Sequence, residues 1–341
     1  MRSKRVKFGI RTSVPVSVIQ GQAAGMTSGQ WLQLPAAAGI LAALTDPTGF
    51  WLIAEMNDIG FDPVRRKAHL VAKRQGSPGF FYRHSYYDEF AHAWTAVGNV
   101  LDSPGHGYDG QAIHPTTGQI AWVPYFQSRI WLQNADDLGN WSQTTDWPVA
   151  PDGNPAPGFT CWYGTLTGVT AGAYIVFTGA HLSIYDIAAA GWDTTLTVSG
   201  GITSYTMVAN YQPNGNFMLF GGGNSQPRKL WRLNSDLSID AMTDAPVNFG
   251  VQVPAAGVNG YFIPDPLSSK FILVNSAGTT YELDPNGNGG LGTWTLLPNA
   301  PVNVYSSSRA SVFWPDPNNG VIVNANIGSA GQTPTMYLYK F

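Results

Sequence analysis

The chain has 341 residues and a formal net charge of −3, with 11% charged and 13% aromatic residues. Coiled coils, helical bundles and disordered chains need more Glu, Lys or Ala, or fewer aromatics, so this composition argues against all three. The near-neutral charge argues against general nucleic-acid binding, and the single Cys161 excludes an intrachain disulfide framework and a multi-cysteine zinc site.

Residues 1–28 are predicted to form a basic arm. Its charged residues are Arg2, Lys4, Arg5, Lys7 and Arg11. They give the first eleven residues a charge of +5, no Asp or Glu occurs before residue 46, and the remaining 330 residues carry −8. We expect the arm to anchor the following domain on a larger assembly. A disordered start and a signal peptide cleaved near Ala23-Ala24-Gly25 are the alternatives.

A repeat begins at Phe61-Asp62-Pro63. An aromatic or apolar residue precedes X-Pro, a short polar turn and an apolar strand, as in Ile113-His114-Pro115 before Ile120–Val123. The prolines stand at positions 63, 115, 213, 266 and 317, spaced by 52, 98, 53 and 51 residues. The spacing of 98 is close to two units, and a unit near Leu166-Thr167-Gly168 has no proline. The period is therefore about fifty residues.

A second pattern runs in phase with the first. A tryptophan opens the last strand of most units. These residues are Trp94, Trp141, Trp192 and Trp294, with Met242 in the comparable place. We expect the tryptophan side chains to belong to the core. Each unit thus contains three or four short strands separated by Gly, Pro, Asn and Asp turns. A period of this length with four antiparallel strands is typical of a propeller blade.

The ends of the chain are predicted to meet. The last unit has strands near 310–314, 320–325 and 336–341 but lacks its outer strand, and Trp31–Pro35 matches Trp294–Pro298 of the preceding unit. The sequence therefore predicts an all-β, six-bladed propeller of four-stranded antiparallel blades, in which the N-terminal strand completes the C-terminal blade. Residues 29–341 form this single domain. Seven blades would follow if residues 36–60 or 142–168 held another unit.

The residues resemble the kelch and galactose-oxidase type of β-propeller. Tyr87-Asp88 with Trp94, and Tyr185-Asp186 with Trp192, share the kelch spacing, and Gly221-Gly222-Gly223 looks like the kelch double glycine. The stretch 106–113 is similar to one in uncharacterised bacterial and phage propeller proteins. Copper-radical chemistry is not expected, because it requires a cysteine cross-linked to a ligand tyrosine, and Cys161 is alone in the stretch Phe159-Thr160-Cys161-Trp162-Tyr163.

Candidate site residues lie near the innermost strand of each predicted blade. A lyase acting on a uronate would need a base, an acid and a cation, and the candidates are His106, Tyr108 and Arg309. A sugar-binding rim would use aromatic faces and Arg309, with the aromatic candidates Trp162, Tyr163, Tyr205 and Tyr305. No metal site and no cofactor is predicted. His114 occupies the position of Asp62, so a turn role is expected, and His69 and His84 are predicted to be packing or surface residues.

Three functions remain open on the sequence. The favoured one is a non-enzymatic propeller module on the tail or capsid surface of a phage virion. It would contact other virion or assembly proteins through the arm and bind a glycan, protein or host surface. The alternatives are a polysaccharide lyase for acidic polysaccharides and a secreted or periplasmic glycan-binding propeller. No nucleic-acid specificity and no membrane span are expected, and association of copies is left open.

Overall fold

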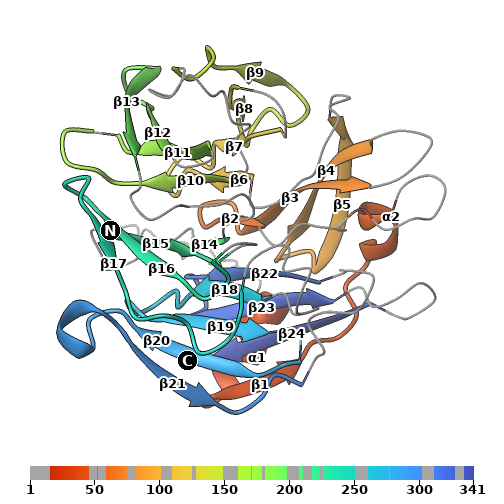
Figure 1. The fold of residues 1–341 in the computed structure, drawn as a ribbon. Helices are drawn as coiled ribbons and strands as arrows, with labels where there is room; N and C mark the ends of the chain where they lie inside the picture. Colours follow the sequence, from red (N-terminus) through yellow and green to blue (C-terminus); the bar gives the residue numbers. More distant parts are fainter. Residues whose placement is uncertain are drawn as a thin grey trace, which may run out of the picture.

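The computed structural model contains six four-stranded antiparallel sheets arranged as a propeller (Figure 1). It describes residues 16–45, 52, 59–74, 81–100, 110–124, 128–148, 160–169, 171–178, 181–197, 207–209, 217–222, 226–249, 260–275, 277–301, 311–326 and 334–341. The innermost strand of each blade contacts the innermost strands of both neighbouring blades, so the ring is closed. Six blades are observed, and the seven-bladed alternative is wrong.

Each of the first five blades is a continuous stretch of chain that runs from the inner to the outer strand. Blade 1 is β2 (Gly60–Asp62), β3 (Lys67–Arg74), β4 (Phe81–Asp88) and β5 (Ala93–Val100). Blade 2 is β6 (Gln111–Ile113), β7 (Ile120–Trp122), β8 (Trp131–Gln133) and β9 (Trp141–Gln143). Blade 3 is β10 (Thr160–Gly164), β11 (Ala173–Thr178), β12 (His181–Asp186) and β13 (Gly191–Thr197). Blade 4 is β14 (Met207–Ala209), β15 (Phe217–Gly221), β16 (Leu230–Asn234) and β17 (Ile239–Ala241). Blade 5 is β18 (Gly260–Pro264), β19 (Phe271–Asn275), β20 (Thr280–Asp284) and β21 (Thr293–Leu297), with a 3₁₀ turn η1 (Asn288–Gly290).

Blade 6 joins the two ends of the chain, as predicted. It consists of β22 (Ser311–Asp316), β23 (Val321–Asn326), β24 (Thr335–Lys340) and β1 (Gln30–Gln33). Strand β1 pairs antiparallel with β24, with Trp31 opposite Tyr339. Because the outer strand comes from one end of the chain and the other three from the opposite end, the backbone hydrogen bonds of this pair hold the ring shut.

Asx turns explain the recurring Asp-Pro pattern. Asp62 Oδ1 accepts the backbone N–H groups of Val64 and Arg65 at 2.9 and 3.1 Å. Asp265 and Asp316 bond to the chain two residues ahead in the same way. The carboxylate satisfies donors that the tight reversal between the first and second strand leaves unpaired, and proline fixes the next φ angle. The recurring Asp-Pro pattern in the sequence therefore reflects the same Asx turn in several blades.

The strand connections define two faces of the ring. The turns from first to second strand and from third to fourth strand lie on one face, which we call the turn face. The connections from second to third strand and from one blade to the next join strand ends on the opposite face, which we call the loop face. This assignment follows from antiparallel pairing alone.

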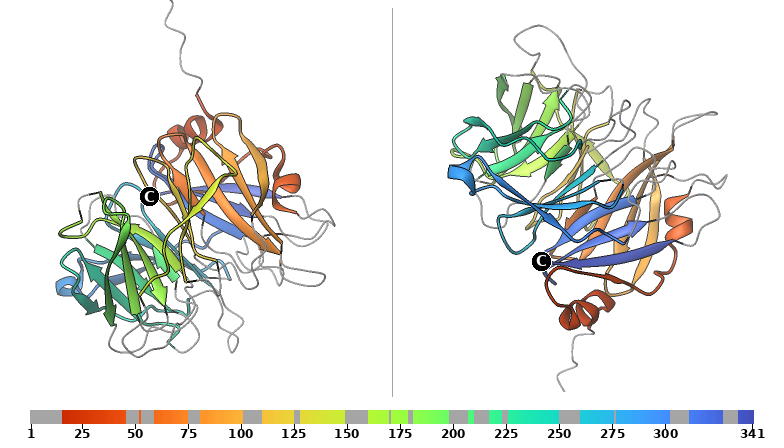
Figure 2. Two further views of the ribbon diagram at one scale, coloured as in Figure 1. Left: turned by 90° about the horizontal axis from the view of Figure 1, so that it is seen from above. Right: turned by 60° about the horizontal axis from the view of Figure 1, so that its bottom comes forward.

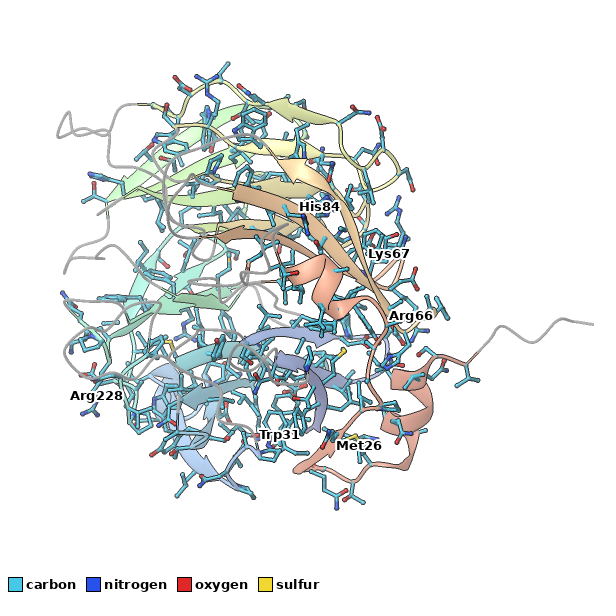
Figure 3. The ribbon with its side chains drawn as sticks, turned by 90° about the vertical axis from the view of Figure 1, so that its right-hand side faces the viewer. Met26, Trp31, Arg66, Lys67, His84 and Arg228 are labelled. Carbon is cyan, nitrogen blue, oxygen red and sulfur yellow. The ribbon has the colours of Figure 1, made fainter. Side chains whose placement is uncertain are left out.

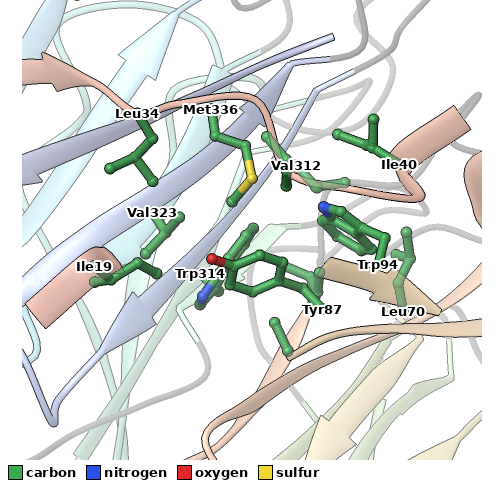
Figure 4. Close-up of a cluster of buried hydrophobic side chains, with 14 of the residues drawn as sticks. Ile19, Leu34, Ile40, Leu70, Tyr87, Trp94, Val312, Trp314, Val323 and Met336 are labelled. Atoms are coloured by element: carbon green, nitrogen blue, oxygen red, sulfur yellow. The ribbon is translucent and has the colours of Figure 1, made fainter. Parts of the chain in front are cut away.

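A large hydrophobic cluster lies where blade 6 meets blade 1 (Figure 4). Trp314 of β22 packs against Tyr87 of β4, with ring centroids 5.7 Å apart, and against Trp94 of β5 at 6.1 Å. Trp94 is buried, and the other outer-strand tryptophans are partly buried and pack against the hydrophobic clusters between blades. These tryptophans therefore belong to the core, as predicted.

Two short helices were not predicted. Helix α1 (Val18–Gly25) lies within the segment predicted as an arm, and α2 (Ile40–Leu44) packs against β4 and β5. Ser17 caps α1 by accepting the N–H of Gln20 at 3.0 Å, and Ile19 and Ala23 are buried on one side of the helix. The signal was the capping box Ser17-x-x-Gln20 followed by apolar residues four apart.

Candidate functional site

Most of the predicted site residues lie outside the described part of the chain. They are His106, Tyr108, Tyr205, Tyr305, Arg309 and the basic residues 2–11. The described strand ends nearest to positions 106, 108, 205, 305 and 309 are at the loop face. The assignments of these residues stay predictions.

Tyr163 and Trp162 belong to β10, the innermost strand of blade 3. The backbone of Trp162 pairs with Ile175, and its side chain lies outside the description. Tyr163 packs on His114 of blade 2 with ring centroids 4.7 Å apart, and its burial raises the pKa of its hydroxyl. Since His114 stands in a turn between first and second strands, Tyr163 lies toward the turn face. The structure therefore does not place it among the connections of the loop face.

His114 has the turn role that its position predicted. Its Nδ1 accepts the backbone N–H groups of Thr116 at 3.2 Å and Thr117 at 3.4 Å, as the Asp carboxylate does in other blades. Partial burial lowers the pKa of the imidazole, which keeps Nδ1 free to accept. The imidazole thus imitates an Asx turn.

The His114 turn can be tested by two substitutions. We expect His114→Asp to change the free energy of unfolding by less than about 1 kcal/mol, because a carboxylate can accept the same two N–H groups. His114→Ala should cost about 1–3 kcal/mol, since it leaves those donors unsatisfied and removes the packing on Tyr163. Urea unfolding followed by tryptophan fluorescence measures both. Equal losses for the two variants would contradict the turn role.

A polar network on the turn face joins the N-terminal segment, blade 1 and blade 6. We call it the closure cluster, and its members are Ser17, Arg66, Glu89, Asp316 and Asn319. The Arg66 guanidinium donates to both oxygens of Glu89, with Nε 2.8 Å from Oε2. The Ser17 hydroxyl donates to Glu89, and the Asn319 side chain donates to Glu89 at 2.8 Å and to Asp316 at 2.5 Å. One buried carboxylate thus holds three segments together.

The electrostatics of the closure cluster are unbalanced. Glu89 and Asp316 are both fully buried, and among the described residues the cation Arg66 forms an ion pair with Glu89. Burial, with a further contribution from the charge of Glu89, raises the pKa of the Asp316 carboxyl to about 7. Asp316 therefore changes its charge near neutral pH.

Further polar contacts link blade 1 to blade 2. Arg65 bonds the buried Asp62 at 2.9 Å, and it also reaches Asp136 and the carbonyl of Thr117 in blade 2. Side-chain contacts of this kind recur between later blades, where Arg232 donates to the Gly290 carbonyl at 2.6 Å. These hydrogen bonds link neighbouring blades along the turn face.

His69 and His84 form a buried pair between blade 1 and blade 2. Nδ1 of His69 lies 3.0 Å from Nε2 of His84, and Trp141 packs edge-on against His84 at 6.0 Å. Figure 3 labels His84 among the side chains. Burial lowers the pKa of His84 to about 3 and lowers that of His69 well below its ordinary value. Both rings are therefore neutral at pH 7, and the prediction of a packing role holds.

The described residues contain neither a metal-binding group of side chains nor a membrane-spanning helix. Within the ranges given above, no three His, Cys, Asp or Glu side chains lie close enough together to hold a metal ion. No described helix is long and apolar enough to span a membrane.

Comparison with known proteins supports the fold. No protein-family model and no curated protein matches the chain. Among solved structures, an auxiliary nutrient-binding protein from Bacteroides ovatus has a TM-score of 0.55 at 13% identity, covering 84% of this chain and 69% of that one. An α-L-arabinanase from Penicillium chrysogenum, complexed with arabinobiose, has a TM-score of 0.51 at 11% identity, covering 91% and 98%. The Cps50 (Swd1) β-propeller domain of Myceliophthora thermophila scores 0.50 at 12% identity, covering 83% and 82%. These similarities establish a β-propeller and leave its activity open.

Proposed function

We propose that this chain is a non-enzymatic binding module, anchored by its basic arm to a larger assembly such as the surface of a phage virion. The loop face, opposite to the anchor, would bind a glycan or a protein. A secreted location is the alternative. We also propose the kelch-like subtype, supported by the packing of Tyr87 on Trp94 at 5.6 Å and of Tyr185 on Trp192 at 5.2 Å.

The separation of anchor and binding face carries the proposal. Helix α1 lies beside the end of blade 6 that belongs to the turn face (Figure 2). There Lys340 donates to the Ala23 carbonyl at 2.8 Å, and Ser17 bonds Glu89. The N-terminal segment thus joins the ring on the face opposite to the strand ends nearest the predicted ligand residues. A module displayed on an assembly needs this polarity, because its ligand face must point away from its attachment.

The proposed ligand class rests on aromatic chemistry. Trp162, Tyr205 and Tyr305 are candidates for stacking on the apolar C–H faces of sugar rings. One of the structural neighbours is an arabinanase complexed with arabinobiose, and another is described as nutrient-binding. Neither protein is similar enough in sequence for its ligand to be inferred for this chain. The aromatic candidates are therefore the basis for proposing a glycan ligand.

Truncation at two points tests the anchor. Removing residues 1–15 should leave the thermal midpoint unchanged while abolishing incorporation into the native particle. Removing residues 1–25 should also lower the free energy of unfolding by about 3 kcal/mol, because the buried Ile19 and Ala23 and the Ser17–Glu89 bond are lost. Scanning calorimetry and purified native particles measure the two effects. Incorporation of the chain without residues 1–15 would contradict the anchor.

Ligand binding is measured separately on the purified chain without residues 1–15. Binding to a glycan array should be retained in this truncated chain and lost in Tyr205→Ala and Tyr305→Ala, with Tyr281→Ala on the outer part of blade 5 as a control. Release of unsaturated sugars from uronate polymers, detected in the near ultraviolet, would show that the module is an enzyme and overturn the proposal.

A further inference from the structure

Exposed apolar side chains are concentrated around the closure cluster. Within the described residues, four of the seven strongly exposed large hydrophobic side chains adjoin it, and we call them the apolar rim: Val16, Val64, Phe90 and Leu267, which are 68%, 59%, 44% and 60% exposed. The other three, Leu41, Leu291 and Leu296, lie on α2 and in blade 5. Grouped exposed apolar residues mark an interaction surface more often than scattered ones do.

Contacts connect the four residues of the apolar rim across blades 5, 6 and 1. The Arg66 guanidinium lies over the Phe90 ring at 4.8 Å, and the Asn318 side chain donates to the Pro63 carbonyl, next to Val64, at 2.9 Å. Leu267 covers Gly320 so closely that a Cβ there would lie 2.5 Å from its Cδ1. Val16 precedes Ser17 of the closure cluster. The rim is therefore one surface at the point where the N-terminal segment leaves the ring.

The arm has a pattern that suits this surface. Val6, Phe8 and Ile10 alternate with Arg5, Lys7 and Arg11, apart from Gly9. In an extended segment, alternate side chains point to opposite sides, so residues 5–11 would present one apolar and one basic side.

The charges near the rim are complementary to the arm. The charged groups beneath and beside it are four basic and seven acidic residues, namely Arg65, Arg66, Lys67, Lys270, Asp62, Asp88, Glu89, Asp136, Asp265, Glu282 and Asp316. Their formal sum is −3, or −2 when Asp316 is protonated. An arm of charge +5 is attracted to this surface, and its apolar side gains burial there.

We propose that the apolar rim is the docking surface for residues 5–11 of a second copy of this chain. Because each arm begins at the rim of its own copy, two copies related by a two-fold axis can exchange arms reciprocally, and each covers the other's rim. The proposal deepens the proposed function by naming a partner of the arm, and it rests on the arm being an interaction segment.

The oligomeric state of the purified full chain tests the exchange, measured by sedimentation velocity over a range of concentrations. The full chain should dimerise and the chain without residues 1–15 should be monomeric. Leu267→Asp should raise the dimer dissociation constant about tenfold or more, while Leu296→Asp, at 63% exposure on the same blade, should leave it unchanged. In the arm, Phe8→Asp should weaken the dimer more than Gly9→Asp, which changes the charge equally but lies on the basic side.

Three results of these measurements would overturn the proposed arm exchange. A full chain that is monomeric at every concentration overturns the exchange, including the case in which the arm covers the rim of its own copy. A dimer that survives removal of residues 1–15, or equal effects of Leu267→Asp and Leu296→Asp, also overturns it. If the chain is monomeric but still needs residues 1–15 for incorporation into particles, the anchor stands and only the exchange fails.

Discussion

Replacing Arg66 by alanine is expected to lower the free energy of unfolding by about 3–5 kcal/mol, the usual cost of leaving a buried charge unpaired. Arg66 holds both oxygens of the fully buried Glu89 and also donates to Asn319 at 3.1 Å. Without it, the buried Glu89 would have no paired cation and would lie near Asp316, to which Asn319 links it. Because these groups join blade 1 to blade 6, the loss should open the ring at its closure.

Two controls make the Arg66 prediction specific. Lys229→Ala removes the exposed pair between Lys229 and Asp244 and should cost less than about 1 kcal/mol. The double variant Arg66→Met with Glu89→Gln removes both charges and should be more stable than Arg66→Ala alone, because no uncompensated charge remains on Glu89. Chemical unfolding curves provide the measurement, and an Arg66→Ala loss as small as that of Lys229→Ala would refute the role of the cluster.

The fold could be predicted because its information is local and repeated. Each blade needs a turn from first to second strand, and Asp62, Asp265 and Asp316 supply the same acceptor for it. The strands predicted near 310–314, 320–325 and 336–341 agree with β22, β23 and β24 to within two residues at each end. Closure was predictable for the same reason, because Trp31–Pro35 repeats the outer strand of blade 5 and the C-terminal stretch of blade 6 lacks an outer strand.

The closure cluster was not predictable, because its members are brought together only by the closed ring. Glu89 and Asn319 are 230 residues apart, and neither belongs to a recurring pattern of the sequence. A charged residue in a turn most often faces solvent, so Glu89 gave no sign of complete burial. The loop-face candidates are a different case: the fold fixes the strand ends near them, and ligand chemistry there depends on connections that vary from blade to blade.

The pH dependence of stability should reveal two opposing groups. The folded-state pKa of His84 is about 3, below the ordinary value of 6.5, so its stabilising contribution is present above pH 6.5 and is lost as pH falls toward 3. The folded-state pKa of Asp316 is about 7, above the ordinary value of 3.8, so its contribution is present below pH 3.8 and is lost as pH rises through 7. At 1.36 kcal/mol per pKa unit, His84 changes stability by about 5 kcal/mol and Asp316 by about 4 kcal/mol over their ranges.

Between pH 4 and 6.5 the two contributions have opposite slopes and partly cancel. We therefore expect His84→Gln to gain stability relative to the parent as pH falls from 6.5 to 4, and Asp316→Asn to gain relative to it as pH rises from 4 to 7. Glutamine and asparagine are suitable because each can keep a hydrogen bond without a charge, to Nδ1 of His69 and to the N–H groups of Asn318 and Asn319. Urea unfolding at half-unit pH steps gives the three curves. Parallel curves for parent and variants would show that neither buried group titrates as its surroundings require.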